Sequence, residues 1–302
     1  IAALRNYFAK HAFKNTTLDD LLIELEKTSG RDLKPWVATW LQTAGVNTLR
    51  PEIIVSDNKY SKVNVLQEAP KIPAGSKELR PHRLAVGLYD IKGDKLVRRE
   101  SVELDVSGTS TSVDGLIGQN QADLLLINDK DMSYAKVRLD DRSIATLKTH
   151  IGKVDDDLTR SMLWAVIWDM LRDSELSATD FIEILLSGIE AETNISVVTS
   201  LGAQLQTAIE FYANPKHRDQ LRANAANKVL EILNRAKAGD DFQLQFTRLF
   251  AALADHDQIK ELKEILSGKL NGLVLDLDMR WLLTNSIAER GGFTKADLDA
   301  EL

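Results

Sequence analysis

The sequence predicts a multidomain α+β protein with a short helical segment, a small antiparallel β-sandwich and an all-α domain of paired helices. Apolar residues recur at helical spacing over residues 1–46 and again over residues 141–302, whereas they alternate with polar residues in between. Three of the six prolines, which interrupt helices, lie between Pro70 and Pro81 in the middle region. We therefore expect three domains, at residues 1–47, 48–140 and 141–302.

The composition is that of an ordinary globular protein, with 44% hydrophobic and 27% charged residues in a chain of 302. A net charge of −7 without a basic run argues against nucleic acid and anionic membranes as partners. The longest nearly apolar stretch, Met162–Leu171, is too short to span a bilayer and contains Asp169. The absence of cysteine excludes disulfides and thiolate chemistry, and it suits the cytoplasm, where we expect the protein.

The chain is expected to be a piece of a longer protein. Residue 1 is Ile, and a helical pattern is already running there without a capping residue. If the first helices normally pack on a missing domain, an apolar patch should be exposed at Trp36, at Trp40 or along the Leu18–Leu25 stripe. Such a patch would promote weak self-association, although a monomer is the expected state.

The helical segment has recognisable end signals. Thr17 followed by Asp20 is typical of a capping box at a helix start. Gly30 is expected to end that helix in a left-handed conformation. Asp32 is then expected to cap a third helix, and Gly45 to stop it.

The middle region alternates as strands do. In residues 102–106 and 135–140 every second side chain is apolar, and the others, among them Arg138, face the opposite way. Residues 56–58 and 92–94 are typical of tight turns, and residues 128–131 are interpreted as a turn between strands. About six or seven short strands over this length favour a small sandwich.

The last region is helical throughout. The helices are expected to start near residues 157, 178, 196, 217, 241, 257, 275 and 294. Taken in pairs, these starts repeat about every 40 residues, which is typical of stacked αα-hairpins of the HEAT or armadillo kind. The sequence itself shows no clear repeat, so a plain helical bundle is the alternative.

No catalytic or metal-binding constellation is visible in the residues. The closest pair of the five histidines, His217 and His256, is 39 residues apart, and the chain has no His-Glu-x-x-His motif. The chain also lacks a phosphate-binding glycine loop and a nucleophile elbow. We therefore assign no catalytic residue and no metal ligand, and the substrate-binding residues are unknown.

Three other features have a functional and a structural interpretation. The acidic run Asp155–Asp157 could suggest calcium, but its place before an apolar helix favours a helix cap. Trp164 and Trp168 could stack on a ligand, but a helix that is apolar on most sides is usually buried. Asn15 and Asn194 match the glycosylation sequon, and we attribute both matches to chance.

Several stretches of the chain resemble the aminopeptidase N family of zinc metallopeptidases, which are gluzincins, and its actinobacterial branch most closely. The stretches that resemble the end of the family's catalytic domain are Phe8–Leu22, Ser29–Leu33 and Trp36–Glu52. Residues 128–140 resemble the closing strands of its sandwich domain. The stretches that resemble its C-terminal helical domain are Leu163–Asp173 and Leu277–Leu283.

This resemblance implies that the parent protein removes N-terminal residues from peptides with zinc bound upstream of residue 1. The family's motifs bind zinc, supply a catalytic tyrosine and supply a glutamate that recognises the N-terminus of the peptide. None of them maps onto this chain, so the fragment is expected to be inactive alone. Its expected partners are the missing N-terminal and catalytic domains of the same chain and, in the parent, peptide substrates. The helical domain would close a chamber over the active site and limit substrate access.

A curved stack of helix pairs offers a concave face that can line such a chamber. Arg160, Arg172 and Arg280 could attract a peptide carboxylate there, but surface salt bridges are the simpler role for each. The alternative function is a non-enzymatic module, in which the sandwich and the helical stack bind a protein partner.

Overall fold

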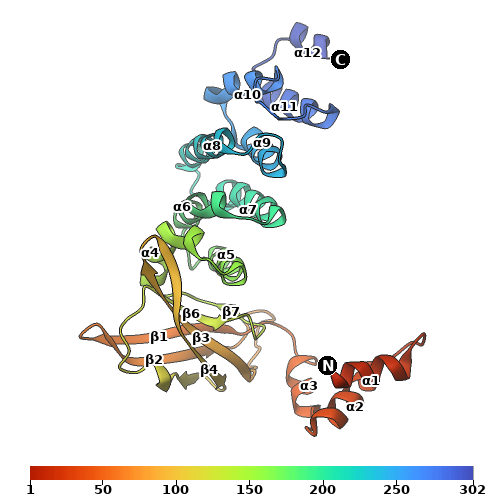
Figure 1. The fold of residues 1–302 in the computed structure, drawn as a ribbon, viewed down its shortest axis with the longest axis vertical. Helices are drawn as coiled ribbons and strands as arrows, with labels where there is room; N and C mark the ends of the chain where they lie inside the picture. Colours follow the sequence, from red (N-terminus) through yellow and green to blue (C-terminus); the bar gives the residue numbers. More distant parts are fainter. Residues whose placement is uncertain (302) are drawn as a thin grey trace.

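The computed structural model describes residues 1–301, which form three parts along the chain (Figure 1). The first part contains short helices, the second two small β-sheets and the third a stack of helices. In Figure 1 the stack rises from one end of the sheets, whereas the first helices lie apart from it at the lower right. The mixed α+β class predicted from the sequence is confirmed.

The capping signals of the first part are found as predicted for the second helix. The helices are α1 (Ala2–His11), α2 (Leu18–Ser29) and α3 (Lys34–Trp40). The Thr17 side chain accepts a hydrogen bond from the backbone N–H of Asp20, and the Asp20 carboxylate accepts one from the N–H of Thr17. Gly30 ends α2 in the left-handed conformation, at φ 68°. At Ile1, α1 begins without a side-chain cap.

The predicted ends of α3 are wrong. The helix stops at Trp40, and Gly45 lies in the turn beyond it, at φ 90°. Arg80 explains the early end, because its guanidinium donates hydrogen bonds to the carbonyl oxygens of Thr39 and Ala44, at 3.1 and 3.4 Å. At the other end Leu33 holds the N-cap position, and Asp32 only accepts a hydrogen bond from the N–H of Lys34, at 3.0 Å.

Residues 48–137 form two sheets, with the strand orders β5-β2-β1-β7 and β4-β3-β6. The strands are β1 (Thr48–Ser56), β2 (Lys59–Glu68), β3 (His82–Lys92), β4 (Lys95–Val106), β5 (Ser110–Ser112), β6 (Leu124–Asp129) and β7 (Lys136–Val137). Their number agrees with the six or seven expected, but β1 to β4 have 9, 10, 11 and 12 residues and are not short.

One strand pair departs from the antiparallel pattern expected for the whole region. β1 and β7 run parallel, with Thr48 opposite Lys136 and Leu49 opposite Val137. A parallel pair needs a long connection, and here the other five strands lie between the two in sequence. The remaining paired strands in the described residues are antiparallel.

The third part consists of helices that follow the predicted starts to within two residues. They are α4 (Asp141–His150), α5 (Asp157–Arg172), α6 (Ala178–Gly188), α7 (Ile195–Thr207), α8 (Arg218–Arg235), α9 (Asp241–Leu253), α10 (Ile259–Leu266), α11 (Leu277–Glu289) and α12 (Lys295–Glu301). Helix α4 was not predicted, because two of its three buried residues, Ser143 and Thr146, are polar. It covers the edge of β6, where the Leu125 N–H donates to the Ser143 hydroxyl at 3.0 Å.

The helices of the stack form two rows (Figure 1). Helices α5, α7, α9 and α11 lie on the side towards α1–α3, and α4, α6, α8 and α10 lie on the other side. One contiguous cluster of buried hydrophobic side chains runs through the sheets and the stack, from Leu49 to Ile287. The second and third parts therefore share a single core. None of the helices in residues 1–301 has the length and apolar character that crossing a bilayer requires.

Candidate functional site

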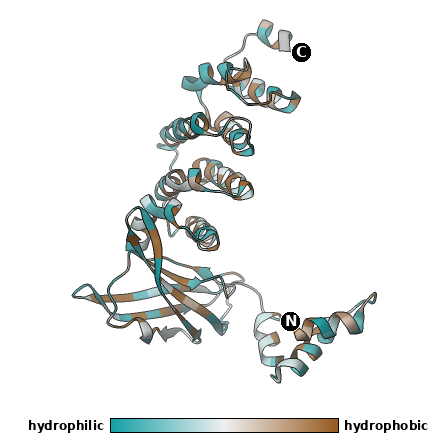
Figure 2. Cartoon of the chain, viewed as in Figure 1, coloured by the Kyte–Doolittle hydropathy of each residue, from teal (hydrophilic) through white to brown (hydrophobic). Residues whose placement is uncertain are grey.

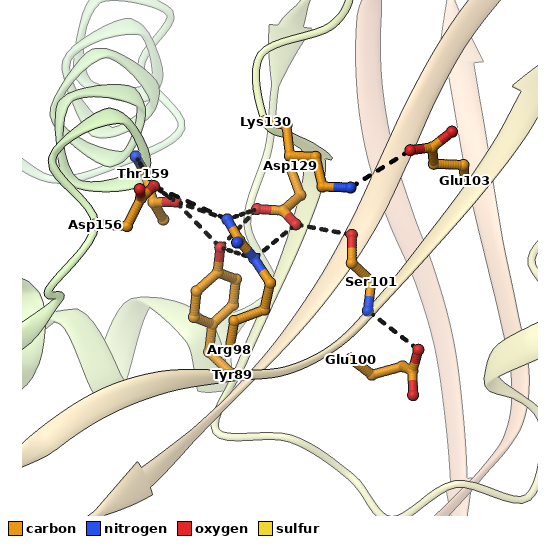
Figure 3. Close-up of polar contacts among 9 residues, drawn as sticks. All are labelled: Tyr89, Arg98, Glu100, Ser101, Glu103, Asp129, Lys130, Asp156 and Thr159. Atoms are coloured by element: carbon orange, nitrogen blue, oxygen red, sulfur yellow. Dashed lines mark hydrogen bonds and ion pairs between the residues drawn. The ribbon is translucent and has the colours of Figure 1, made fainter.

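Two clusters of charged side chains fasten α5 to the sheets, one at each end of the helix. The first surrounds Asp129, a fully buried carboxylate at the end of β6 (Figure 3). The Tyr89 hydroxyl donates to its Oδ1 at 2.5 Å, and the Ser101 hydroxyl to its Oδ2 at 3.0 Å. Arg98 places Nη2 3.0 Å from Oδ1 and Nε 3.0 Å from Oδ2. Each oxygen of this carboxylate therefore has two partners.

The same cluster reaches the first turn of α5 (Figure 3). Nη2 of Arg98 donates to the Thr159 hydroxyl at 3.1 Å and lies 3.9 Å from Oδ2 of Asp156. Asp156 is the N-cap of α5, and its carboxylate accepts the Thr159 N–H at 2.8 Å. Hydrogen bonds from Thr159 hold the pKa of Asp156 below its usual value. The cap predicted for residues 155–157 is confirmed at Asp156.

The Asp129 cluster is built to hold a position and is poorly suited to proton transfer. Burial raises the pKa of Tyr89, and the hydrogen bond to Asp129 raises it further, so the phenol stays protonated and remains a donor. A general base needs a free lone pair within reach of a substrate, and the Asp129 carboxylate has none. Space for that carboxylate depends on Gly87, where a Cβ would lie 2.7 Å from Cγ of Asp129.

The second cluster follows the last turn of α5. Lys136 donates to both oxygens of Asp173, at 2.9 and 2.6 Å, and Arg138 bonds to the same carboxylate. Nε of Arg138 lies 3.0 Å from Oε1 of Glu175, whose Oε2 accepts from Nη1 of Arg50 at 2.9 Å. Burial raises the pKa of both carboxyls, but the bonds from these cations outweigh it and keep both pKa values below normal.

The position of Arg138 departs from the simple alternation expected over residues 135–140. Its neighbour Val137 is buried, so strict alternation would turn Arg138 away from the core, yet its side chain is only 1% exposed. The reason is that the sheet is covered here by the end of α5. Asp173 and Glu175 from that helix end supply the counter-charges that make a buried guanidinium tolerable.

Arg160 is not available to a substrate. It is 5% exposed, and its Nε donates to Oε1 of Glu192 at 2.7 Å while Nη1 donates to the carbonyl oxygen of Val154 at 2.6 Å. The expected salt bridge is present, but it is buried and does not lie on the surface. Arg172 and Arg280 are exposed, on α5 and α11.

The tryptophans of α5 support the buried-helix interpretation. Trp164 is 4% exposed and donates its indole N–H to Oε1 of Glu192 at 2.6 Å. Trp168 packs against Phe181, with ring centroids 5.5 Å apart, and against Tyr212 at 6.1 Å. These contacts use the rings for packing between helices.

The histidines are dispersed over the molecule, and residues 1–301 contain no group of three or more His, Cys, Asp or Glu arranged to hold a metal ion. His82 is buried between the Ser133 hydroxyl, 2.7 Å from Nδ1, and Oε1 of Gln67, 2.9 Å from Nε2. Burial, together with the nearby charge of Arg80, lowers the pKa of His82 to about 4.

Helices α2 and α3 border a groove of about 590 Å³, called here the α2–α3 groove. Its apolar lining comes from Leu22, Ile23, Val37 and Ala38, and its polar rim from Asp19, Glu26, Lys34 and Gln42. Of the residues expected to be exposed, Leu18 and Trp36 are 45% and 44% exposed, whereas Leu21, Leu22 and Leu25 are half-buried; Ile23, outside the predicted stripe, is 50% exposed. Trp40 is not part of the exposed patch, since its ring packs edge-on against His82 at 5.2 Å.

Sequence reasoning missed the residues of the Asp129 cluster. The turn predicted over residues 128–131 is present, since the Asp131 N–H donates to the Asn128 carbonyl oxygen at 2.9 Å, but its first two residues also belong to β6. A usable signal was present in the sequence. Asp129 comes almost directly after the continuous apolar run Leu124–Ile127, and a carboxylate at the end of a fully buried strand requires partners.

Comparison with known proteins gives two matches. A model of the ERAP1-like C-terminal domain family matches residues 124–302. The chain is also similar to a protein named Aminopeptidase N from Streptomyces lividans, with 46% identity over 303 residues, 98% of this chain and 35% of that relative. The chain thus spans about a third (35%) of the length of the curated relative that it matches.

Proposed function

This chain belongs to the aminopeptidase N family as a C-terminal fragment, and on that premise we propose that it is the non-catalytic end of a peptidase. The complete protein would remove N-terminal residues from peptides. The observation that carries this proposal is the 46% identity over 98% of the chain, which includes all three of its parts. Family membership does not favour the alternative of a free-standing interaction module.

The residues of this chain do not fit a zinc site. Zinc in hydrolases takes three protein ligands at about 2 Å, commonly with two histidines one helical turn apart. The five histidines are far apart in sequence, and residues 1–301 hold no group of three or more candidate ligands. We therefore propose that the parent binds its zinc upstream of this chain and that the fragment alone does not hydrolyse peptides.

We infer that the helical stack limits access to the parent's active site. Helices α5, α7, α9 and α11 lie on the side towards α1–α3, where the resemblance places the end of the catalytic domain. The two charge clusters on α5 would keep the stack fixed relative to the sheets. In this proposal the sheets form a β-sandwich that acts as a spacer, and the helix pairs form an α-solenoid of the HEAT or armadillo kind.

The experiment compares three proteins in an aminoacyl-arylamide assay with zinc. The 302-residue chain alone should give no turnover, and the complete protein should be active. The complete protein without residues 277–302, which keeps the sheets and helices α4–α10 together, should hydrolyse the small arylamide but lose part of its discrimination against large or folded substrates. Turnover by the isolated chain would contradict the proposal, as would unchanged discrimination after removal of α11 and α12.

A further inference from the structure

A small pocket lies between two helix connections of the stack, the one from α6 to α7 and the one from α8 to α9. It is called here the Glu192 pocket and has a volume of about 380 Å³. Pockets that bind ligands have volumes of roughly 300 to 1,000 Å³, so this one suits a small ligand or a single side chain. Its lining residues are Glu190, Glu192, Thr193, Ile232, Arg235, Ala236, Phe242 and Phe246.

The walls of the Glu192 pocket are apolar. Ile232 and Phe246 are 2% and 3% exposed, and Phe242 is half-buried. These residues come from α8 and α9, along which hydrophobic and hydrophilic residues are interspersed (Figure 2). Walls of this kind stabilise the hydrocarbon part of a ligand, because it leaves water when it binds.

Glu192 brings a charge to this apolar pocket. Its side chain is 3% exposed. Oε1 accepts hydrogen bonds from Nε of Arg160 at 2.7 Å and from the indole N–H of Trp164 at 2.6 Å. Oε2 accepts none from any residue in the range 1–301, although it remains accessible to solvent. A carboxylate oxygen in such a place is costly without a donor, so the pocket favours a ligand that supplies one.

The charges around the pocket favour a cation as that donor. Arg160 shares its charge between Glu192 and Asp157, which accepts from Nη2 at 2.6 Å. Arg235 is held by Glu190 through two hydrogen bonds, at 2.9 and 2.8 Å. The lining therefore carries two carboxylates and one guanidinium, and that guanidinium is already paired. An anion would be repelled, and a neutral donor would bind Oε2 more weakly than a charged one does.

The single open oxygen selects the kind of cation. A guanidinium group binds a carboxylate best through both oxygens at once, but Oε1 of Glu192 already has two partners. An ammonium group is a compact donor and needs only one oxygen. We propose that the Glu192 pocket binds a primary ammonium group carried on an unbranched apolar chain of about four to six carbons. A free alkylamine and a lysine side chain share this chemistry.

The test is isothermal titration calorimetry of the 302-residue chain with n-hexylammonium, n-hexanol and n-hexanoate. The ammonium should bind about tenfold more tightly than the alcohol, because its bond to Oε2 is charge-assisted, and the carboxylate should not bind. Absence of ammonium binding would overturn the proposal. Equal affinity for the ammonium and the alcohol would also overturn it, since Glu192 would then not be recognised.

Two variants locate the binding. Ala236→Phe should fill the pocket without changing its charges and weaken ammonium binding about tenfold, whereas Ala203→Phe, at an exposed position on α7, should not. Glu192→Gln should weaken it by a similar factor, and its control is Glu183→Gln, where the side chain is 55% exposed. Circular dichroism checks that each variant is folded. Unchanged affinity in folded Ala236→Phe would place the binding elsewhere and overturn the proposal.

Two further probes identify the source of the ammonium group. Tighter binding of Nα-acetyl-lysine N-methylamide than of n-hexylammonium would support the pocket as a site for a lysine side chain of a peptide. The reverse order would support it as a site for a free alkylamine. Binding of n-hexylguanidinium as tight as that of n-hexylammonium would contradict the argument from the single open oxygen. None of these measurements depends on peptide hydrolysis, so they test this inference separately from the proposed function.

Discussion

Asp129 shows how a buried charge is held at the scale of single residues. Its carboxylate accepts hydrogen bonds from Tyr89, Ser101 and Arg98, and the backbone approaches closely enough at Gly87 that a methyl group there would collide with it. Removing one member takes a partner from the fully buried Asp129 carboxylate or takes that carboxylate away from its donors. The cluster therefore acts as a unit, and the cost of a single substitution exceeds that of one hydrogen bond.

Asp129→Ala should lower the free energy of unfolding by about 3 kcal/mol, since it removes the buried carboxylate that pairs with Arg98 and accepts from Tyr89 at the junction with α5. Urea denaturation followed by circular dichroism measures this loss. Asp105→Asn serves as the control, because that side chain is 80% exposed and should change stability by less than about 0.5 kcal/mol. A loss equal to that of the control would show that the cluster does not hold the junction.

His82 should make stability depend on pH in a defined window. Its pKa is about 4 in the folded protein, against 6.5 ordinarily, so below pH 6.5 the unfolded chain binds a proton that the folded chain does not. Stability should therefore fall as the pH drops from 6.5 to 4, by up to about 3 kcal/mol. His82→Gln should flatten this part of the curve in thermal unfolding, and an unchanged slope would contradict the assignment.

At the scale of elements, α5 is the connection between the sheets and the stack. Its N-terminal cap at Asp156 meets Arg98 from β4, and the residues after its C-terminus, Asp173 and Glu175, meet cations from β1 and β7. Its buried face also carries Trp164, which bonds to Glu192. A helix held at both ends has little freedom to rotate against the sheets.

The charge cluster after the last turn of α5, which contains Asp173 and Glu175, should weaken in acid. The folded-state pKa values of Asp173 and Glu175 lie below the ordinary values of 3.8 and 4.5. Their contribution to stability is therefore complete above the ordinary pKa values, and it is lost as the pH falls through the pKa values of the folded protein. Unfolding measured between pH 5 and pH 2 should show this loss. In Arg138→Met the loss over the same range should be smaller, because part of the favourable charge pairing is already absent.

At the scale of the whole molecule, the shared core predicts a single unfolding transition for residues 48–290. In calorimetry the van't Hoff and calorimetric enthalpies should agree. Arg138→Met should lower the midpoint temperature of this transition and leave it single, since it removes the buried cation between Asp173 and Glu175 but keeps the shared core. Two transitions in the unmodified chain would show that the shared core does not couple the two parts.

The local elements of this protein follow from its sequence. The capping box at Thr17, the left-handed Gly30 and the caps before α5 depend on neighbours within four residues, and apolar spacing located eight helix starts to within two residues. The family was likewise indicated by sequence segments alone. These features survive because the interactions that create them are short-range.

Tertiary structure decided the rest. The burial of Arg138 depends on the end of α5, and the end of α3 depends on Arg80. The parallel pairing of β7 with β1 depends on the strands between them. All of these partners lie far away in the sequence. The Asp129 cluster draws its members from β3, β4, β6 and α5, so no local pattern could assemble it. Side-chain burial and charge pairing are properties of the packed molecule, because they depend on which surfaces the fold brings together.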